Sequence, residues 1–428
     1  MRYLLAGASL RGMVDVATTL VDEKAEILLF DTESYVSPPE AGSVTLLPKE
    51  WSAEFLAGVD RVVTSPWFSD TRPPLSDAID AGIPVITEAG FGLQRLSIPY
   101  VAVTGTNGKT TVTEVTTAML RASGIDALAG GNIGTPVSGL RNADAAMLVL
   151  ELSSYQLRFI DQLEPLAAAL LNIAPDHLDW HGTFARYRDA KTRLFASMGP
   201  SDILVYNVDD PVVVDAVRSA RCHLVPCSGT HLPSGGNGVD GTEIVVDGTR
   251  FATGTSDNTM LFDLVVAATL ALAAGAEQEA VANTISAFTP GAHRRQHIGV
   301  VDGVAWVNDS KATNPHATLA AVGAFESVIL LAGGRNKDVD LSPIAELTSV
   351  CRIVAFGESG DEIARLAKGV IPVAPTLGAA VAIAREIAVK GDTVLLSPGC
   401  ASFDEFSSYA ERGEAFTSLV CSFDEVGV

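Results

Sequence analysis

The sequence is poor in positive charge, in cysteine and in long apolar stretches, and each shortage excludes a class of protein. Lys and Arg number 29 against 51 Asp and Glu, which gives a formal net charge of −22. This acidity disfavours nucleic acid or an anionic membrane surface as the main partner. The five cysteines are scattered and odd in number, so we expect reduced thiols and a cytoplasmic location. We expect neither a membrane span nor a signal peptide, because no apolar run is long enough and the chain opens on a strand pattern.

Lysine is the scarcer of the two basic residues. Only eight lysines accompany 21 arginines, and four of the eight, at positions 109, 191, 311 and 337, lie inside the motifs described below. A chain that otherwise prefers arginine keeps lysine where a compact ammonium or a titratable amine is needed. These four positions are therefore candidates for chemistry.

What the sequence does contain is a repeated alternation of strand and helix patterns. The first block, 1–97, has strand patterns at 2–7, 26–31, 61–65 and 84–87. The second, 98–291, has them at 98–104, 145–150 and 166–173, and its part 228–256 is typical of hairpins and loops. The third, 292–428, has them at 298–307, 327–332, 352–356, 371–374 and 393–397. The alternation predicts an α/β protein of three domains with mainly parallel, doubly wound sheets, whose ligands lie at the carboxyl ends of the strands.

The most informative segment follows the first strand of the second block. Gly105-Thr-Asn-Gly-Lys-Thr-Thr111 leads from that strand into a helical pattern. Gly105 and Gly108 allow backbone N–H groups to converge on an anion at a helix N-terminus, Lys109 supplies a charge for the outer phosphates, and the hydroxyl of Thr110 suits Mg²⁺. The loop is shorter than a standard Walker A motif, which would place a glycine where Val103 stands. The second block is thus predicted to be a central ATP-binding domain of the P-loop ATPase type.

Two further strand ends of this block carry polar groups. Glu151 follows the strand pattern 145–150, where a Mg²⁺ ligand belongs in a phosphate-loop domain. His177 follows the pattern 166–173 in the stretch Ala174-Pro-Asp-His-Leu-Asp179. Both side chains are expected near the carboxyl edge of the sheet.

A lysine lies within the apolar face of the helix predicted over 184–198. The stripe is Phe184, Tyr187, Lys191, Leu194, Phe195 and Met198. Burial disfavours the charged form of such an amine, and a neutral amine can add CO₂ to give a carbamate able to help bind a metal. The alternative is a lysine whose stem is buried while its ammonium reaches solvent. The sequence leaves both interpretations open.

Polar loops also end strands of the third block. They are Trp306–Pro315, Gly333–Asp338 and Ser397–Phe406, and the segment Gly291–Gln296 precedes them with paired arginines. The arginines could clamp a nucleotide phosphate or form structural ion pairs, and Ser402 or Asp404 could simply cap the last helix. Three polar loops at one sheet edge favour a small-molecule site.

Taken together, these motifs resemble those of the Mur ligase superfamily, over nearly the whole chain and most firmly at 101–195 and 293–409. The segments Glu-Leu-Ser-Ser-Tyr-Gln-Leu at 151–157 and Leu-Ser-Pro-Gly-Cys-Ala-Ser at 396–402 favour its D-glutamate-adding branch. The resemblance implies an ATP-dependent amide ligase that joins D-glutamate to UDP-N-acetylmuramoyl-L-alanine through an acyl phosphate, in peptidoglycan precursor synthesis. It also implies ATP, two Mg²⁺ ions and a carbamoylated lysine as cofactors. We expect a monomer without nucleic-acid or membrane partners.

The resemblance assigns roles to the three blocks and to particular residues. The first block, Rossmann-like, would bind the UDP substrate, and the third, also Rossmann-like, the amino acid. Catalysis would use Lys109, Glu151, His177 and Lys191, and the metals Thr110, Glu151, His177 and Lys191. ATP would be bound by Gly105, Thr106, Asn107, Gly108, Lys109, Thr110, Thr111, Arg294 and Asp309. The substrates would contact Leu10, Arg11, Asp31, Thr32, Asn132, Ser153, Thr313, Lys337, Ser402, Phe403 and Tyr409.

The sequence departs from the family at positions that bind the nucleotide bases. The family's His-Asn-x-x-Asn motif, whose Asn contacts adenine, is replaced by Leu261-Phe-Asp-Leu-Val265. Ser65-Pro-Trp67 stands for Ser-Pro-Gly, and Glu33 stands where a basic residue is common. Three rival functions stay open: another ligase of the superfamily such as a folylpolyglutamate synthase, a nucleotide-binding regulator without ligase chemistry, and a dinucleotide oxidoreductase suggested only by the glycine turn at 7–12.

Overall fold

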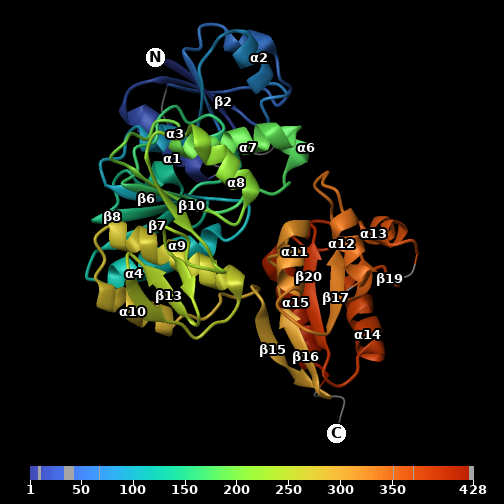
Figure 1. Ribbon diagram of the computed structural model, residues 1–428. Helices are drawn as coiled ribbons and strands as arrows, with labels where there is room; N and C mark the ends of the chain where they lie inside the picture. Colours follow the sequence, from blue (N-terminus) through green and yellow to red (C-terminus); the bar gives the residue numbers. More distant parts are fainter. Residues whose placement is uncertain (8–10, 33–42, 67, 350, 370, 424–428) are drawn as a thin grey trace. The chain divides into compact units, whose positions relative to one another are not determined.

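The chain folds into two compact units. The computed structural model describes residues 1–428 except 8–10, 33–42, 67, 350, 370 and 424–428. One unit consists of Met1–Ile173 and Ala185–Phe288, and the other of Ala174–Phe184 and Thr289–Val428. The first unit contains the two predicted N-terminal blocks, each with its own sheet, and the second contains the third block together with the short segment 174–184 (Figure 1).

The first block forms a parallel sheet with the strand order β3-β2-β1-β4-β5. Its strands are β1 (Arg2–Ala6), β2 (Glu26–Phe30), β3 (Val44–Leu46), β4 (Arg61–Thr64) and β5 (Val85–Thr87), and its helices α1 (Arg11–Asp22), α2 (Leu75–Asp80) and α3 (Glu88–Leu93). One apolar cluster joins α1 and α3 to the sheet, and a second joins α2 to it. The order and the two apolar faces confirm the predicted Rossmann-like arrangement.

The second block is built on a parallel sheet with the order β11-β10-β9-β6-β8-β7. The strands are β6 (Tyr100–Thr104), β7 (Ala127–Gly131), β8 (Met147–Glu151), β9 (Ala167–Leu170), β10 (Ile203–Asn207) and β11 (His223–Cys227). Its helices are α4 (Lys109–Ala122), α5 (Ser154–Leu157), α7 (Phe184–Thr192), α8 (Pro211–Ala216), α9 (Asn258–Ala273) and α10 (Gln278–Ser286). As expected for 228–256, a small antiparallel sheet follows: β12 (Gly238–Asp240), β13 (Glu243–Val246) and β14 (Thr249–Ala252). Helix α9 is apolar over most of its surface because it packs against both α4 and this small sheet.

The third block forms a sheet with the order β15-β16-β20-β17-β18-β19. Its strands are β15 (Gln296–Val301), β16 (Val304–Asn308), β17 (Val328–Gly333), β18 (Arg352–Phe356), β19 (Val373–Ala374) and β20 (Thr393–Gly399). Helices α14 (Leu377–Ile387) and α15 (Tyr409–Cys421) contribute to one apolar cluster, and α11 (Pro315–Val322), α12 (Ser342–Glu346) and α13 (Gly360–Leu366) to the other. The sheet is therefore covered on both faces, as a doubly wound fold requires.

The structure corrects three sequence-based element bounds. The strand predicted over 298–307 is the hairpin β15–β16, because Asp302 and Gly303 both have positive φ, 53° and 79°, and form a tight turn. The helix predicted over 184–198 ends as α7 at Thr192 and continues as a 3₁₀ turn over Arg193–Phe195. The strand predicted over 166–173 ends at Leu170. Among the described residues, no helix combines the length and the apolar character that a membrane crossing needs.

Candidate active site

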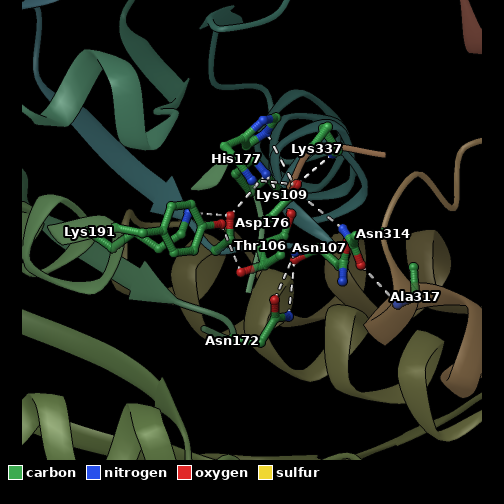
Figure 2. A network of polar contacts seen from close by, with 12 residues as sticks. Thr106, Asn107, Lys109, Asn172, Asp176, His177, Lys191, Asn314, Ala317 and Lys337 are labelled. Carbon is green, nitrogen blue, oxygen red and sulfur yellow. Dashed lines mark hydrogen bonds and ion pairs between the residues drawn. The ribbon is translucent and has the colours of Figure 1, made fainter. Parts of the chain in front are cut away.

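The phosphate loop lies where the sequence predicts it, between the end of β6 and the start of α4. Gly108 is the residue before α4 and has a φ of 84°, a conformation that favours glycine. A Cβ at this position would lie 2.6 Å from Oδ1 of Asp263 on α9, so a side chain there would require Asp263 or the loop to move. The loop is further fixed by Asn172: its Oδ1 accepts from Asn107 N at 2.7 Å and its Nδ2 donates to Asn107 O at 3.1 Å (Figure 2).

Two lysine amines converge on the same carbonyl of this loop. Lys109 Nζ donates to the carbonyls of Gly105 and Thr106, both at 2.9 Å, and Lys191 Nζ donates to Gly105 O at 2.7 Å (Figure 2). Lys191 is only 1% exposed. The structure therefore excludes the alternative in which its ammonium reaches solvent.

Tyr187 holds the side chain of Lys191 against the loop. Its hydroxyl lies 2.9 Å from the hydroxyl of Thr106, and Lys191 Nζ lies 4.7 Å from the centre of its ring. Tyr187 precedes Lys191 by one helical turn, so α7 presents both side chains on one face. We did not predict a role for Tyr187 beyond core packing, although its four-residue spacing from Lys191 was visible in the sequence.

Glu151 occupies the last position of β8, where it is 2% exposed and paired in register with Val103 of the neighbouring β6. Its Oε1 accepts a hydrogen bond from Asn132 Nδ2 at 2.7 Å. Its Oε2 is buried and has no hydrogen-bond partner among the described residues. A buried carboxylate oxygen without a partner is costly, so this atom fits a cation ligand. No group of three or more His, Cys, Asp or Glu side chains in the described part of the chain could hold a metal by itself.

His177 lies on the segment Ala174–Phe184, which folds with the second unit. Its neighbour Asp176, which we did not predict, is 4% exposed and pairs with Lys337 Nζ at 2.5 Å. Asp176 also accepts from Asn314 Nδ2 at 3.1 Å and from His177 N at 2.9 Å (Figure 2). The ammonium of Lys337, predicted to contact the amino acid, is thus held by a buried carboxylate. Only the adjacency of Asp176 to His177 could have indicated this in the sequence.

The other predicted residues of the second unit lie on its strand-end loops. Asp309 follows β16 and accepts from Arg295 N at 3.1 Å and Ser397 Oγ at 2.8 Å. Tyr409 begins α15, and Lys311 Nζ lies 3.8 Å from the centre of its ring. Thr313 and Arg294 are half-buried, Ser402 is buried and Phe403 is 61% exposed. The loops that carry Asp309, Thr313, Lys337 and Ser402 meet at the carboxyl edge of one sheet, as predicted.

The remaining candidates belong to the first unit. Asp31 is buried at the end of β2, and Thr32 beside it is exposed. Leu10 and the side chain of Arg11 lie outside the described residues. Ser153 forms a capping box with Gln156: its Oγ accepts from Gln156 N at 3.3 Å, and Gln156 Oε1 accepts from Ser153 N at 3.0 Å. The Ser-Ser-Tyr-Gln sequence after Glu151 thus has a structural use as the start of α5.

The first unit contains a strand-end phosphate loop with a buried acid and a buried amine, and the second unit is doubly wound. Known protein families match a part of each unit. The Mur ligase middle domain family matches residues 103–231, and the family described as Mur ligase, glutamate ligase domain matches residues 293–400. The chain belongs to the Mur ligase family.

Two relatives that are each 37% identical to this chain carry the same name. The UDP-N-acetylmuramoylalanine--D-glutamate ligase of Syntrophus aciditrophicus is 37% identical over 438 residues, covering 97% of this chain and 95% of that protein. The protein of the same name from Frankia casuarinae is also 37% identical and covers 97% of this chain and 93% of that protein.

Solved structures agree on the fold. The MurF ligase from Thermotoga maritima in complex with ADP superimposes with a TM-score of 0.62 at 18% identity, covering 96% of this chain and 92% of that one. A pseudomurein peptide ligase type C from Methanothermus fervidus gives a TM-score of 0.62 at 14% identity, with 99% of both chains covered.

Proposed function

We propose that the protein is an ATP-dependent ligase that adds D-glutamate to UDP-N-acetylmuramoyl-L-alanine in peptidoglycan precursor synthesis. The observation that carries this proposal is the buried amine of Lys191, 2.7 Å from the phosphate-loop carbonyl of Gly105. A nucleotide-binding regulator or an oxidoreductase does not require a second lysine, buried behind the phosphate loop, in addition to Lys109. The names of the full-length relatives favour D-glutamate over other amino acids.

In the first half-reaction, the substrate carboxylate attacks the γ-phosphate of ATP to give an acyl phosphate and ADP. The backbone N–H groups at the start of α4 would bind the phosphates, since they have no acceptor within the helix. Lys109 would neutralise charge that spreads over the transferred phosphoryl group. Its amine is already directed into the loop by two carbonyls, so little reorientation is required.

Magnesium fits this loop through Glu151 and Thr110. Glu151 offers a buried oxygen without a partner, and Thr110 a hydroxyl in the first turn of α4. Because no three-acid cluster is present in the described residues, the other ligands would be phosphate oxygens and water. When bound, the metal ions would neutralise charge on the phosphates. His177 is proposed as a ligand of the second ion. A carbamate on Lys191 would help to place that ion.

In the second half-reaction, the amine of D-glutamate attacks the acyl phosphate and releases phosphate. Thr313, Lys337, Ser402, Phe403 and Tyr409 are proposed to bind this amino acid, and Arg294 and Asp309 the nucleotide. Asp176 would set the position of Lys337 through their 2.5 Å ion pair. The uridine end of the other substrate is assigned to Leu10, Arg11, Asp31 and Thr32, with Asn132 and Ser153 nearer the reacting carboxylate.

The proposed setting is that of a monomer in the cytoplasm, where ATP and UDP-linked precursors are available. We further propose three domains, 1–97, 98–291 and 292–428, for the UDP substrate, ATP and the amino acid.

A panel of amino acids tests the proposed function. ADP release is measured with UDP-N-acetylmuramoyl-L-alanine and, in turn, D-glutamate, L-glutamate, L-alanine and no amino acid. We expect release that depends on D-glutamate. Release with a folate substrate and L-glutamate would favour the folylpolyglutamate synthase alternative, and ATP binding without release under any condition would favour a regulator.

A further inference from the structure

Arg412 of α15 is a charged side chain in the core of the second unit. It is 0% exposed, and among the described residues no carboxylate forms an ion pair with it. Asp404 and Glu405 influence it from nearby, but they accept hydrogen bonds from the backbone N–H groups of Glu358 and Leu377. Burial lowers the pKa of the Arg412 guanidinium to about 10, which still leaves it cationic at neutral pH.

All three nitrogens of the Arg412 guanidinium donate hydrogen bonds to loops at the carboxyl edge of the sheet. Nε donates to Ser310 Oγ at 3.0 Å, and Nη2 donates to Ser310 O at 2.9 Å. Nη1 donates to Cys400 O at 3.1 Å. Ser310 Oγ in turn donates to Tyr409 O at 2.7 Å. One side chain therefore joins the loop after β16, the loop after β20 and the first turn of α15.

The loop after β17 packs against the same guanidinium. A Cβ at Gly334 would lie 3.1 Å from Arg412 Nη1 and 2.3 Å from Ala401 O. Arg335 and Ala401 exchange backbone hydrogen bonds of 2.8 and 2.9 Å, which joins this loop to the one after β20. The residues proposed to bind the amino acid, Thr313, Lys337, Ser402 and Tyr409, all lie on these loops.

A neutral side chain could fill the space of Arg412 at less electrostatic cost. An unpaired buried charge is expensive, and replacing one with an apolar residue of similar volume is often neutral or stabilising for folding. A buried guanidinium at position 412 has a use if an anion binds at the loops that Arg412 supports. D-glutamate carries two carboxylates and one ammonium, so its net charge has the required sign.

We propose that Arg412 is a positioning residue of the amino-acid site, which holds the three strand-end loops in their binding arrangement and supplies positive charge for an anionic amino acid. The proposal rests on the ligase function given above. It concerns the second unit alone, so its effect falls on the amino acid rather than on ATP.

The test measures KM for D-glutamate and KM for ATP in the wild type and in Arg412→Lys, Arg412→Met and Ser310→Ala. Arg412→Met removes charge and hydrogen bonds, Arg412→Lys keeps only the charge, and Ser310→Ala removes the hydroxyl that joins Arg412 to Tyr409. Arg365→Met, on the exposed surface of α13, is the matched control.

Arg412→Met is expected to raise KM for D-glutamate about tenfold or more while changing KM for ATP less than about twofold. Arg412→Lys should recover part of the loss, and Ser310→Ala should give a smaller rise of the same kind. Equal changes in both KM values, or unchanged KM for D-glutamate, would overturn the proposal. If Arg412→Met does not fold, the Arg412→Lys and Ser310→Ala values decide. A wild type that releases no ADP with D-glutamate would instead refute the ligase function, and the two failures are thus distinguishable.

Discussion

At the scale of single residues, the structure adds the burial and the partners of each side chain to what the motifs predict. Lys191 and Glu151 were predicted from helix periodicity and from a strand end, and both are nearly inaccessible. Asp176, Tyr187 and Arg412 were not predicted, because their importance depends on partners distant in sequence: Lys337, Thr106 and Cys400. Periodicity identifies the face of a helix but not the side chain that lies opposite it.

Lys191→Ala should lose activity by about a hundredfold or more, because the substitution removes the amine that donates to Gly105 O of the phosphate loop. If the active form is a carbamate, high bicarbonate with a short carboxylate should restore part of the turnover. Lys49→Ala, at an exposed position, is the control and should retain full activity. Normal turnover of Lys191→Ala would remove this amine from the mechanism.

Burial also predicts a pH dependence at Glu88. This side chain is 6% exposed, its Oε1 accepts from Ser138 N at 2.7 Å, and burial raises its pKa above 4.5. The folded state therefore holds the proton more tightly than the unfolded state, and stability falls as pH rises from about 4.5 through the folded-state pKa.

Glu88→Gln keeps the acceptor and removes the charge. It should raise the Tm by about 2 °C or more at pH 7.5, and the gain should shrink as the pH approaches 4.5. Thermal unfolding at several pH values measures this. Glu50→Gln, on an exposed residue, should change nothing, and an equal gain at all pH values would contradict the assignment to Glu88.

At the scale of elements, the sequence predicts the strands and helices that have a clear apolar pattern. Strands such as β6, β8 and β17 were predicted because short runs of apolar residues mark them. The hairpin β15–β16 was predicted as one strand because apolar residues lie on both sides of Asp302-Gly303, although an Asp-Gly pair with positive φ values is typical of a two-residue hairpin turn. The stretches that form β3, β7, β10 and β11 were not predicted as strands.

Gly108→Ala tests the close approach at the phosphate loop. The new Cβ would meet Asp263 Oδ1 at 2.6 Å, so either the Asp263 side chain or the start of α4 must shift, and KM for ATP should rise about tenfold. Gly124→Ala is the control: its φ is 77° but nothing lies within 4 Å of the added Cβ. It should cost about 1 kcal/mol of stability and leave KM for ATP unchanged. A KM for ATP that is the same in both variants would contradict the predicted effect of this close approach.

At the scale of the whole molecule, three α/β blocks are distributed over two compact units. Composition and strand spacing predict three α/β blocks, and the sheets confirm them. The predicted central block, 98–291, includes the segment Ala174–Phe184, which belongs to the second compact unit. Within that unit, Asp176 of this segment pairs with Lys337 at 2.5 Å.

The central claim is that ATP activates a substrate carboxylate as an acyl phosphate before the amine attacks. The most direct measurement uses UDP-N-acetylmuramoyl-L-alanine labelled with ¹⁸O in its carboxylate, with ATP and D-glutamate, and determines the label in released phosphate by mass spectrometry. We predict one ¹⁸O atom in each phosphate. Phosphate without label, formed while the amide product accumulates, would contradict this mechanism.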